Sequence, residues 1–538
     1  MDSYVRGADL PLLKQTIHET FAATARRFPD SEALVVPYEN VRLTWSALAA
    51  EVDHTARALA GLGLEPGDRM GIWATNCAEW IFLQMAAAQA GITLVNINPA
   101  YRAHELQYVL RRSRIKAIFL KEADEKATYA DVLANAIDGQ DLPLEQTVFI
   151  GSQSWHDFLE HGHDIPHHRT TPSDVANIQY TSGTTGNPKG VLLTHRNIVN
   201  NGHFIAMWIH ADERDRICVP VPMYHCFGCV IGAMVSINTG AAIVFPGERF
   251  HALPTMQAIQ AERCTLLYGV PTMFIAQLNQ PEFGQFDFTS LRGGIMAGAP
   301  CPVEIMNRVI DEMHCPQLTI VYGQTESSPV ITGSMADDSL ERRCHTVGCV
   351  FPQTEMKLID HETGLTVEMG QVGEVCTRGY LVMKGYDGDP EGTRTAVDVD
   401  GWLHTGDLGV LREDGYLHLT GRAKDVIIRG GENIYPKEVE NFLHTHPAVA
   451  NVEVIGVPDL KLGEAVAAWI VLKPGSQATE DEIRQFCRGQ IAHFKIPQYV
   501  RFVDAFPTTV TGKTQKYIMR QREIELRHLE DAARIVTA

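Results

Sequence analysis

A short run of hydroxyl-bearing residues and glycines has the composition of a phosphate-binding loop. Between Thr181 and Gly190 the sequence TSGTTGNPKG places four hydroxyl side chains, three glycines and one lysine within ten residues. Hydroxyl groups can donate to phosphate oxygens, and glycines allow successive backbone amides to turn toward one anion. A flexible surface loop with this composition would need no particular order of residue types. The predicted phosphate ligands are Thr181, Ser182, Gly183, Thr184, Thr185, Gly186 and Lys189.

This loop differs from the common nucleotide-binding loop. The Walker A pattern G-x-x-x-x-G-K-[ST] has its lysine directly after a glycine, whereas Lys189 precedes Gly190. A second candidate, Gly512-Lys513-Thr514, has Pro507 where the pattern requires a glycine. We therefore reject a P-loop NTPase.

The order of motifs along the chain resembles the adenylate-forming superfamily, which includes acyl-CoA synthetases, peptide-synthetase adenylation domains and luciferases. The resemblance rests on LTW from Leu43, YTSGTTGNPKG from Tyr180, VPMYHCFG from Val221, GAP from Gly298, YGQTE from Tyr322, GWLHTGDLG from Gly401, GRAKDVIIRGGENIYPKEVE from Gly421 and PTTVTGK from Pro507. These motifs cover nearly the whole chain. Together with NINPAYRAHELQYVL, the general pattern looks most like a medium-chain fatty acyl-CoA synthetase.

The resemblance implies a two-step reaction with ATP, Mg²⁺ and CoA. A carboxylic acid attacks the α-phosphate of ATP to give acyl-AMP and pyrophosphate, and the CoA thiol then displaces AMP. No protein nucleophile is needed, so catalysis is positioning and charge stabilisation. By resemblance Lys513 bridges the carboxylate and the phosphate, Glu326 and Thr184 hold Mg²⁺, and His225 completes the predicted catalytic set.

The same resemblance assigns nucleotide contacts. Tyr322 would stack on adenine, Thr325 would contact the α-phosphate, and Asp407 and Arg422 would bind the ribose. The other predicted nucleotide-binding residues are Gly298, Ala299, Pro300, Gly323, Gln324 and Lys513.

Lys424 matches the hinge position of the superfamily. The implied domains are 1–423, which binds the nucleotide, and 424–538, a mobile domain that carries Lys513. Rotation between the two steps would withdraw Lys513 and bring Gly430, Gly431 and Glu432 to the site, where they would contact CoA.

His225 lies where the superfamily places a wall beside the substrate carboxylate. We expect a positioning role, because a carboxylic acid is already ionised at neutral pH and needs no general base. Cys226, Gly228, Cys229 and Gly232 predict an uncharged, roomy acyl channel, and Cys229 stands where some long-chain members carry a gating tryptophan. The absence of an acidic residue between Met223 and Asn238 disfavours an amino-acid substrate. The Cys226–Cys229 pair has neither a second ligand pair for zinc nor a thioredoxin-like context.

Several alternatives stay open. The acid could be long-chain, aromatic or another small acid, and a fatty acyl-AMP ligase would load a carrier protein in place of CoA. A luciferase-like oxidase has no support in the residues, and a non-enzymatic nucleotide sensor would be expected to lack Lys513 or Glu326, both of which are present. By resemblance Lys513 is also a target for a lysine acetyltransferase and deacetylase.

Alternating helix and strand patterns must position these motifs. Helical spacing from Leu48 to Leu59 precedes a strand at Met70–Trp73, and a helix at Trp80–Ala90 precedes a strand at Thr93–Ile97. This alternation predicts an α/β fold, with mixed and parallel sheets flanked by helices in a large N-terminal domain.

A small α+β unit follows after Gly421. Pro436 begins a helix, strands are expected at 451–457, 465–472 and 499–503, and Thr479 with Glu482 forms a capping box for a helix running to about Phe494. The histidine-rich segment 152–169 is predicted to be a solvated linker. The uncharged segment 225–246 is predicted to form a buried helix, a turn and a strand.

Composition limits the remaining classes. With 538 residues the chain exceeds one hydrophobic core, and its net charge of −19 excludes a basic nucleic-acid-binding face. Eleven scattered cysteines and the lack of a signal-peptide pattern predict a cytoplasmic protein with reduced thiols. We expect no transmembrane segment, while peripheral membrane contact and a homodimer are both compatible with the sequence.

Overall fold

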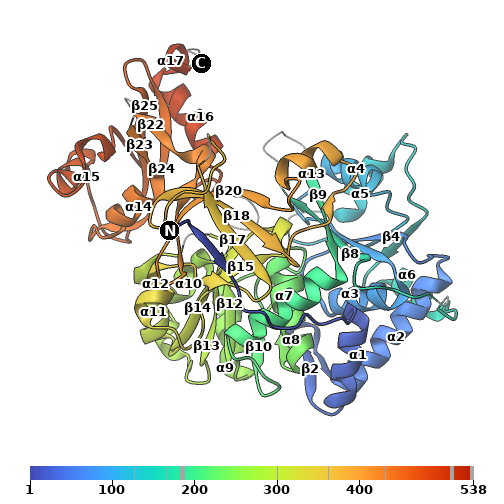
Figure 1. Cartoon of the computed structure of the whole chain (residues 1–538). Coiled ribbons are helices and arrows are strands. Elements are labelled where there is room, and N and C mark those ends of the chain that lie inside the picture. The colour runs from blue at the N-terminus through green and yellow to red at the C-terminus, as the bar shows by residue number, and fades with distance from the viewer. Residues whose placement is uncertain are drawn as a thin grey trace. The chain divides into compact units, whose positions relative to one another are not determined.

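The computed structural model describes residues 1–125, 128–165, 168–181, 188–299, 301–360, 363–429, 432–508 and 514–533. Its contacts divide the chain into two compact units. Figure 1 labels the helices and strands along the chain. Unit 1 comprises 1–4, 357–375 and 405–538, and unit 2 comprises 5–356 and 376–404. The domain boundary at Lys424 was predicted as the position of a hinge. The division by contacts does not test a hinge, so this boundary stays a prediction.

A seven-stranded sheet in unit 2 has the strand order β19-β9-β8-β5-β4-β6-β7. Strands β4 to β8 pair in parallel, whereas β8 with β9 and β9 with β19 pair antiparallel. Strands β4, β5 and β6 are almost completely buried, as expected for parallel strands covered by helices. Its strands are β4 (Arg69–Trp73), β5 (Thr93–Asn96), β6 (Ala117–Leu120), β7 (Gln146–Phe149), β8 (Val175–Thr181), β9 (Lys189–Thr194) and β19 (Gly385–Tyr386).

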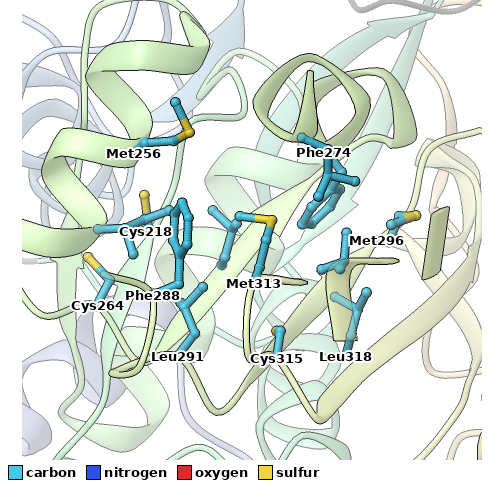
Figure 2. Packing of buried hydrophobic residues seen from close by; sticks show 14 of the residues in the cluster. Cys218, Met256, Cys264, Phe274, Phe288, Leu291, Met296, Met313, Cys315 and Leu318 are labelled. Carbon is cyan, nitrogen blue, oxygen red and sulfur yellow. The ribbon is translucent and has the colours of Figure 1, made fainter. Parts of the chain in front are cut away.

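A nine-stranded sheet in unit 2 has the order β16-β15-β14-β13-β12-β10-β11-β2-β3. Its centre is parallel, and its outer strands β3, β15 and β16 are antiparallel. The strands are β2 (Glu32–Val36), β3 (Val41–Thr44), β10 (Arg216–Cys218), β11 (Ala242–Val244), β12 (Leu266–Gly269), β13 (Gly293–Met296), β14 (Gln317–Gly323), β15 (Val330–Gly333) and β16 (Cys349–Val350). Figure 2 shows the core on this sheet, where Cys218, Cys264 and Cys315 lie among apolar side chains such as Phe274 and Met313.

The helices of unit 2 connect these strands. They are α1 (Ile17–Arg27), α2 (Trp45–Gly61), α3 (Ala78–Ala90), α4 (Ala103–Arg112), α5 (Tyr129–Ile137), α6 (Gln153–Glu160), α7 (His195–Trp208), α8 (Ala233–Thr239), α9 (Ala252–Ala261), α10 (Pro271–Leu278), α11 (Val303–Glu312), α12 (Leu340–His345) and α13 (Pro390–Ala396). The helix and strand predicted at Leu48–Leu59 and Met70–Trp73, and those at Trp80–Ala90 and Thr93–Ile97, are confirmed within a residue or a few at each end.

Unit 1 contains the small α+β unit. Its sheet has the order β23-β22-β25-β24, with β26 paired to β25. The elements are β22 (Ile427–Arg429), β23 (Glu432–Ile434), α14 (Pro436–His444), β24 (Val449–Asp459), β25 (Gly463–Leu472), α15 (Glu480–Cys487), β26 (Tyr499–Phe502), α16 (Lys516–Arg527) and α17 (Glu530–Ala533). The chain passes between the units within four strands: β1 (Tyr4–Arg6), β17 (Thr354–Ile359), β18 (Val372–Gly379) and β20 (Leu403–Leu411). Strand β21 (Leu417–Arg422) pairs with β20.

Two element predictions were wrong. Segment 152–169 is not only a linker, because α6 occupies its first half and buries Trp155 and Phe158 against Phe119, with ring centroids 6.3 and 5.1 Å away. Of the histidines there, His161, His163 and His168 are exposed and His167 lies outside the described residues. The helix capped by Thr479 ends at Cys487 and not near Phe494, because Arg488 is extended and Gly489 has φ of +73°.

The uncharged segment 225–246 folds as predicted into a buried helix, a turn and a strand. A π-helical turn, Phe227–Gly232, leads into α8, Gly240 has φ of +92°, and β11 follows. No helix in the described part of the chain is long and apolar enough to cross a membrane.

Candidate active site

The two ends of the predicted phosphate loop are neighbours in the seven-stranded sheet. Strand β8 ends at Thr181, β9 begins at Lys189, and these two residues are cross-strand partners. The structure therefore brings Thr181 and Lys189 together at the carboxyl end of β8. The other predicted phosphate ligands, Ser182, Gly183, Thr184, Thr185 and Gly186, lie outside the described residues and stay predictions.

Lys189 packs against a tyrosine from a distant segment. Its Nζ lies 4.6 Å from the ring centroid of Tyr386 and 4.0 Å from a carboxylate oxygen of Asp389. A cation over an aromatic face is attracted by the ring quadrupole. Because Tyr386 is paired with Val191 in the β19–β9 ladder, this contact is fixed by the backbone.

The same tyrosine contacts the predicted magnesium ligand. The Tyr386 hydroxyl donates to Oε1 of Glu326 at 2.9 Å. Burial and the neighbouring Glu326 carboxylate raise the pKa of Tyr386, so the phenol keeps its proton. Tyr386 was not predicted from the sequence. Its position within KGYDGDP carries no composition signal, and only the fold shows that it joins Lys189 to Glu326.

Asp387, the residue after Tyr386, holds this segment in place by hydrogen bonds to Gly190 and Arg69. The backbone N–H of Asp387 donates to Gly190 at 2.7 Å. Arg69 donates twice to the buried Asp387 carboxylate, at 2.7 and 3.0 Å. A bidentate, largely buried pair of this kind gives geometric specificity as well as energy. These bonds therefore fix the position of Tyr386 relative to Gly190, the last residue of the predicted phosphate loop.

The YGQTE and GAP motifs follow neighbouring parallel strands. Tyr322 is buried near the end of β14, while Gly298 and Ala299 follow β13, which pairs with β14. Carboxyl ends of parallel strands form the usual ligand-binding edge of α/β sheets. Gly298 has φ of +83°, which favours glycine at this turn. Gly323 and Gln324 continue directly from Tyr322, and Pro300 lies outside the described residues.

The segment predicted to line the acyl pocket contacts the YGQTE motif. The Cys226 thiol lies 3.9 Å from the hydroxyl of Thr325, the residue before Glu326. Burial lowers the pKa of His225 to about 4, so its imidazole is neutral at physiological pH. Its Nε2 is buried and has no hydrogen-bond partner among the described residues. A neutral imidazole fits the expected positioning role, which stays a prediction.

The glycines of this segment do not open space. A Cβ on Gly228 would lie 2.3 Å from the backbone oxygen of Pro222, and one on Gly232 would lie 3.0 Å from Val219. The room inferred from these two glycines is therefore filled by close packing. The Cys229 sulfur accepts hydrogen bonds from Asn96 and Gln179, so this residue has polar partners. That the segment lines the acyl pocket stays a prediction.

The two predicted ribose ligands form an ion pair within unit 1. Asp407 on β20 is the cross-strand partner of Arg422 on β21, and Nε of Arg422 lies 3.0 Å from Oδ1 of Asp407. Asp407 is buried, and its backbone N–H donates to Thr405. Strand pairing therefore holds the two side chains together.

The predicted hinge and CoA residues are only partly described. Lys424 is exposed on the 3₁₀ turn η5 (Ala423–Asp425), and Glu432 is exposed on β23. Gly430, Gly431 and Lys513 lie outside the described residues.

Comparisons with known proteins identify the family of the chain. The family model described as AMP-binding enzyme matches residues 21–387, and the AMP-binding enzyme C-terminal domain matches 438–513. The chain is 44% identical to the putative acyl-CoA synthetase YngI of Bacillus subtilis, over 97% of this chain and 99% of that protein. It is 42% identical to the mitochondrial medium-chain acyl-CoA ligase ACSF2 of Rattus norvegicus, over 97% and 89%.

Solved structures give the same result. A Mycobacterium tuberculosis fatty acyl CoA synthetase has a TM-score of 0.74 at 31% identity, covering 95% of this chain and 99% of that one. The anthranilate CoA ligase AuaEII, solved with anthranoyl-AMP, has a TM-score of 0.87 at 27% identity, covering 95% and 98%. The chain therefore belongs to the AMP-binding enzyme family, and within it to the acyl-CoA synthetases, which are AMP-forming acid–thiol ligases.

Proposed function

We propose that the protein activates a medium-chain fatty acid with ATP and Mg²⁺ and transfers the acyl group to CoA. The observation that carries this proposal is that Lys189 and Glu326 both contact Tyr386. These contacts place a cation and a carboxylate beside the strand ends that flank the predicted phosphate loop. A hard carboxylate oxygen beside phosphates suits Mg²⁺, so Glu326 is the residue that would hold the ion, together with Thr184.

The first step joins two anions, an ionised acid and the α-phosphate. Their repulsion is offset by the positive charge of Lys189 and, we propose, of Lys513, while Mg²⁺ would neutralise the pyrophosphate that leaves. His225 and Cys226 bring no charge, since burial keeps the imidazole neutral and raises the pKa of the Cys226 thiol to about 11. The acid is thus oriented by uncharged groups and attacks without a protein base.

We propose the following nucleotide contacts for this step. Tyr322, Gly298 and Ala299 would bound the adenine, Thr325 would contact the α-phosphate, and Asp407 with Arg422 would bind the ribose. In the second step, rotation at Lys424 would replace Lys513 by the strand that contains Glu432, and the CoA thiol would attack the acyl carbon.

The medium chain length is supported by the identity to ACSF2 and by the uncharged segment around Cys226 and Cys229. The test is to incubate the protein with ATP, Mg²⁺ and CoA and a series of straight-chain fatty acids from short to long, and to assay AMP and acyl-CoA. We expect kcat/KM to be largest for acids of intermediate length. Larger values for long-chain or aromatic acids would contradict the assignment of the acid, and AMP release that does not depend on CoA would favour a carrier-protein acceptor.

Regulation by acetylation of Lys513 is a separate part of the proposal. Acetylation removes the charge that the first step uses, so the modified protein should lose adenylation and regain it on deacetylation. Unchanged activity of stoichiometrically acetylated protein would contradict this. A homodimer would show in sedimentation of the purified protein.

A further inference from the structure

A buried group of charges lies directly after the proposed catalytic lysine. Lys516 is the first residue of α16, and its Nζ donates to Oε1 of Glu440 at 2.6 Å and to the backbone oxygen of Val454 at 3.0 Å. The same Nζ lies 3.2 Å from Oε2 of Glu453. The other oxygen of Glu453 accepts from the hydroxyl of Thr514 at 2.7 Å. The acyl-CoA ligase mechanism as derived above uses none of these groups.

The position of Lys516 is unusual for a cation. A positive charge at the first turn of a helix opposes the helix dipole. Glu440 is only 4% exposed, and burying a carboxylate is costly unless it is paired. Burial alone would lower the pKa of Lys516, but Glu440 and Glu453 outweigh it and hold that pKa above its usual range. Lys516 is therefore kept as a charged link between α16, α14 and β24.

The link fixes the backbone next to Lys513. Thr508 and Thr514 form an antiparallel bridge, and the N–H of Gln515 donates to the oxygen of Pro507 at 2.8 Å. Thr514, the covalent neighbour of Lys513, is thus held by its backbone to Thr508 and by its side chain to Glu453. Glu453 in turn is held by Lys516. The backbone on the two sides of 509–513 is therefore held together by the contacts of Thr508 and Thr514.

We propose that Lys516 is a positioning residue for the adenylation half-reaction, acting through Glu453 and Thr514 on the placement of Lys513. This inference rests on the proposed function, in which Lys513 supplies the charge for the first step. A placement error of about 1 Å at a catalytic group can cost on the order of 100-fold in rate. The alternative is that Lys516 only fastens α16 to the sheet.

Arg520 provides the matched control. It lies four residues further along α16 and donates to Gly456 at 2.6 Å and to Glu464 at 2.7 Å. It fastens the same helix to the same sheet, but it does not lie next to Thr514. Loss of a mere helix attachment should therefore have the same effect at Arg520 as at Lys516.

The experiment compares Lys516→Met, Lys516→Arg, Thr514→Val and Arg520→Met in the full chain. Adenylation is measured by ATP–pyrophosphate exchange, and the second step by thioester formation from synthetic acyl-AMP and CoA. We expect Lys516→Met to lower adenylation kcat by about 10-fold or more and to leave the thioester step close to wild type. Thr514→Val should give a smaller loss of the same kind, Lys516→Arg should recover most of the rate, and Arg520→Met should affect neither step selectively.

A readout that needs no activity is hydrogen exchange of the peptide 507–515 by mass spectrometry. Exchange should be faster in Lys516→Met and in Thr514→Val than in the wild type and Arg520→Met. Thr514→Val keeps the ion pairs, so it tests the link even where Lys516→Met unfolds the domain.

Unchanged exchange in Thr514→Val, or equal loss of both half-reactions in a folded Lys516 variant, would overturn the positioning role. A wild-type protein that activates no acid would instead refute the proposed function, while the exchange rates would still decide whether Lys516 orders this segment.

Discussion

The phenol of Tyr386 donates a hydrogen bond of 2.9 Å to the carboxylate of Glu326, across 60 positions of sequence. We predict that Tyr386→Phe raises the Mg²⁺ concentration needed for half-maximal adenylation by roughly 10- to 100-fold, because a hydrogen bond to a charged group is worth about 1.5–3 kcal/mol. Mg²⁺ titration of ATP–pyrophosphate exchange measures this. The control is Tyr380→Phe, which removes another buried phenol of unit 2. Equal effects of both substitutions would count against a specific role.

Asp407→Asn should weaken ATP binding. The substitution removes the charge that faces Arg422 at 3.0 Å and the acceptor proposed for the ribose. We expect KM for ATP to rise by about 10-fold, equivalent to about 1.4 kcal/mol, with kcat less affected. Initial rates over a range of ATP concentrations check this. Asp414→Asn, on the turn of the same β20–β21 hairpin, removes a surface ion pair with Arg412 and should leave KM unchanged.

Lys513→Ala should separate the two half-reactions. Loss of the bridging charge should slow adenylation by on the order of 100-fold, or about 3 kcal/mol, and should affect thioester formation from preformed acyl-AMP much less. ATP–pyrophosphate exchange and single-turnover thioester assays measure the two steps. If both steps slow equally, the proposed role of Lys513 is wrong.

Lys424→Pro should have the opposite selectivity. Proline fixes φ near −65° and removes an N–H, so it should restrict the exposed turn at Ala423–Asp425. We expect the thioester step to slow more than adenylation, whereas Lys424→Ala, which keeps the backbone free, should slow neither step much. Thioester rates equal to wild type in the proline variant would contradict a hinge at this position.

His195 should make the fold acid-sensitive. It is buried, its Nδ1 accepts from the N–H of Ile17 at 3.2 Å, and burial lowers its pKa from 6.5 to about 4. The unfolded chain therefore takes up the proton first as the pH falls. The contribution to stability is complete above about pH 6.5 and is lost between that value and about pH 4, which corresponds to about 2 kcal/mol at pH 5.

Urea unfolding at pH 8 and pH 5 tests this expectation. His195→Gln keeps a hydrogen-bond acceptor but does not titrate, so the stability difference between the two pH values should shrink. A pH difference as large in the variant as in the wild type would assign the acid sensitivity to other groups.

The sequence by itself determined the chemistry and most of the local structure. The TSGTTGNPKG run, the YGQTE motif and the motif order identify the family, because phosphate binding and adenylation need particular residue types in a particular order. The helices at Leu48–Leu59 and Trp80–Ala90 follow from apolar spacing, and the capping box of Thr479 and Glu482 is present. Local patterns failed at α6, whose two buried aromatic residues need Phe119 as a partner, and at the end of α15, where Arg488 is extended and Gly489 has a positive φ.

Only the tertiary structure decided which residues meet. Tyr386 joins Lys189 and Glu326 because β19 pairs with β9, and nothing in the local sequence encodes that pairing. The glycines of the π-helical turn give close packing and not open volume, which depends on Pro222 and Val219. Lys516 is linked to Glu440 and Glu453 because both α16 and α14 pack on β24. Side-chain types determine which chemistry is available. Long-range strand pairing and packing determine which charged side chains come into contact.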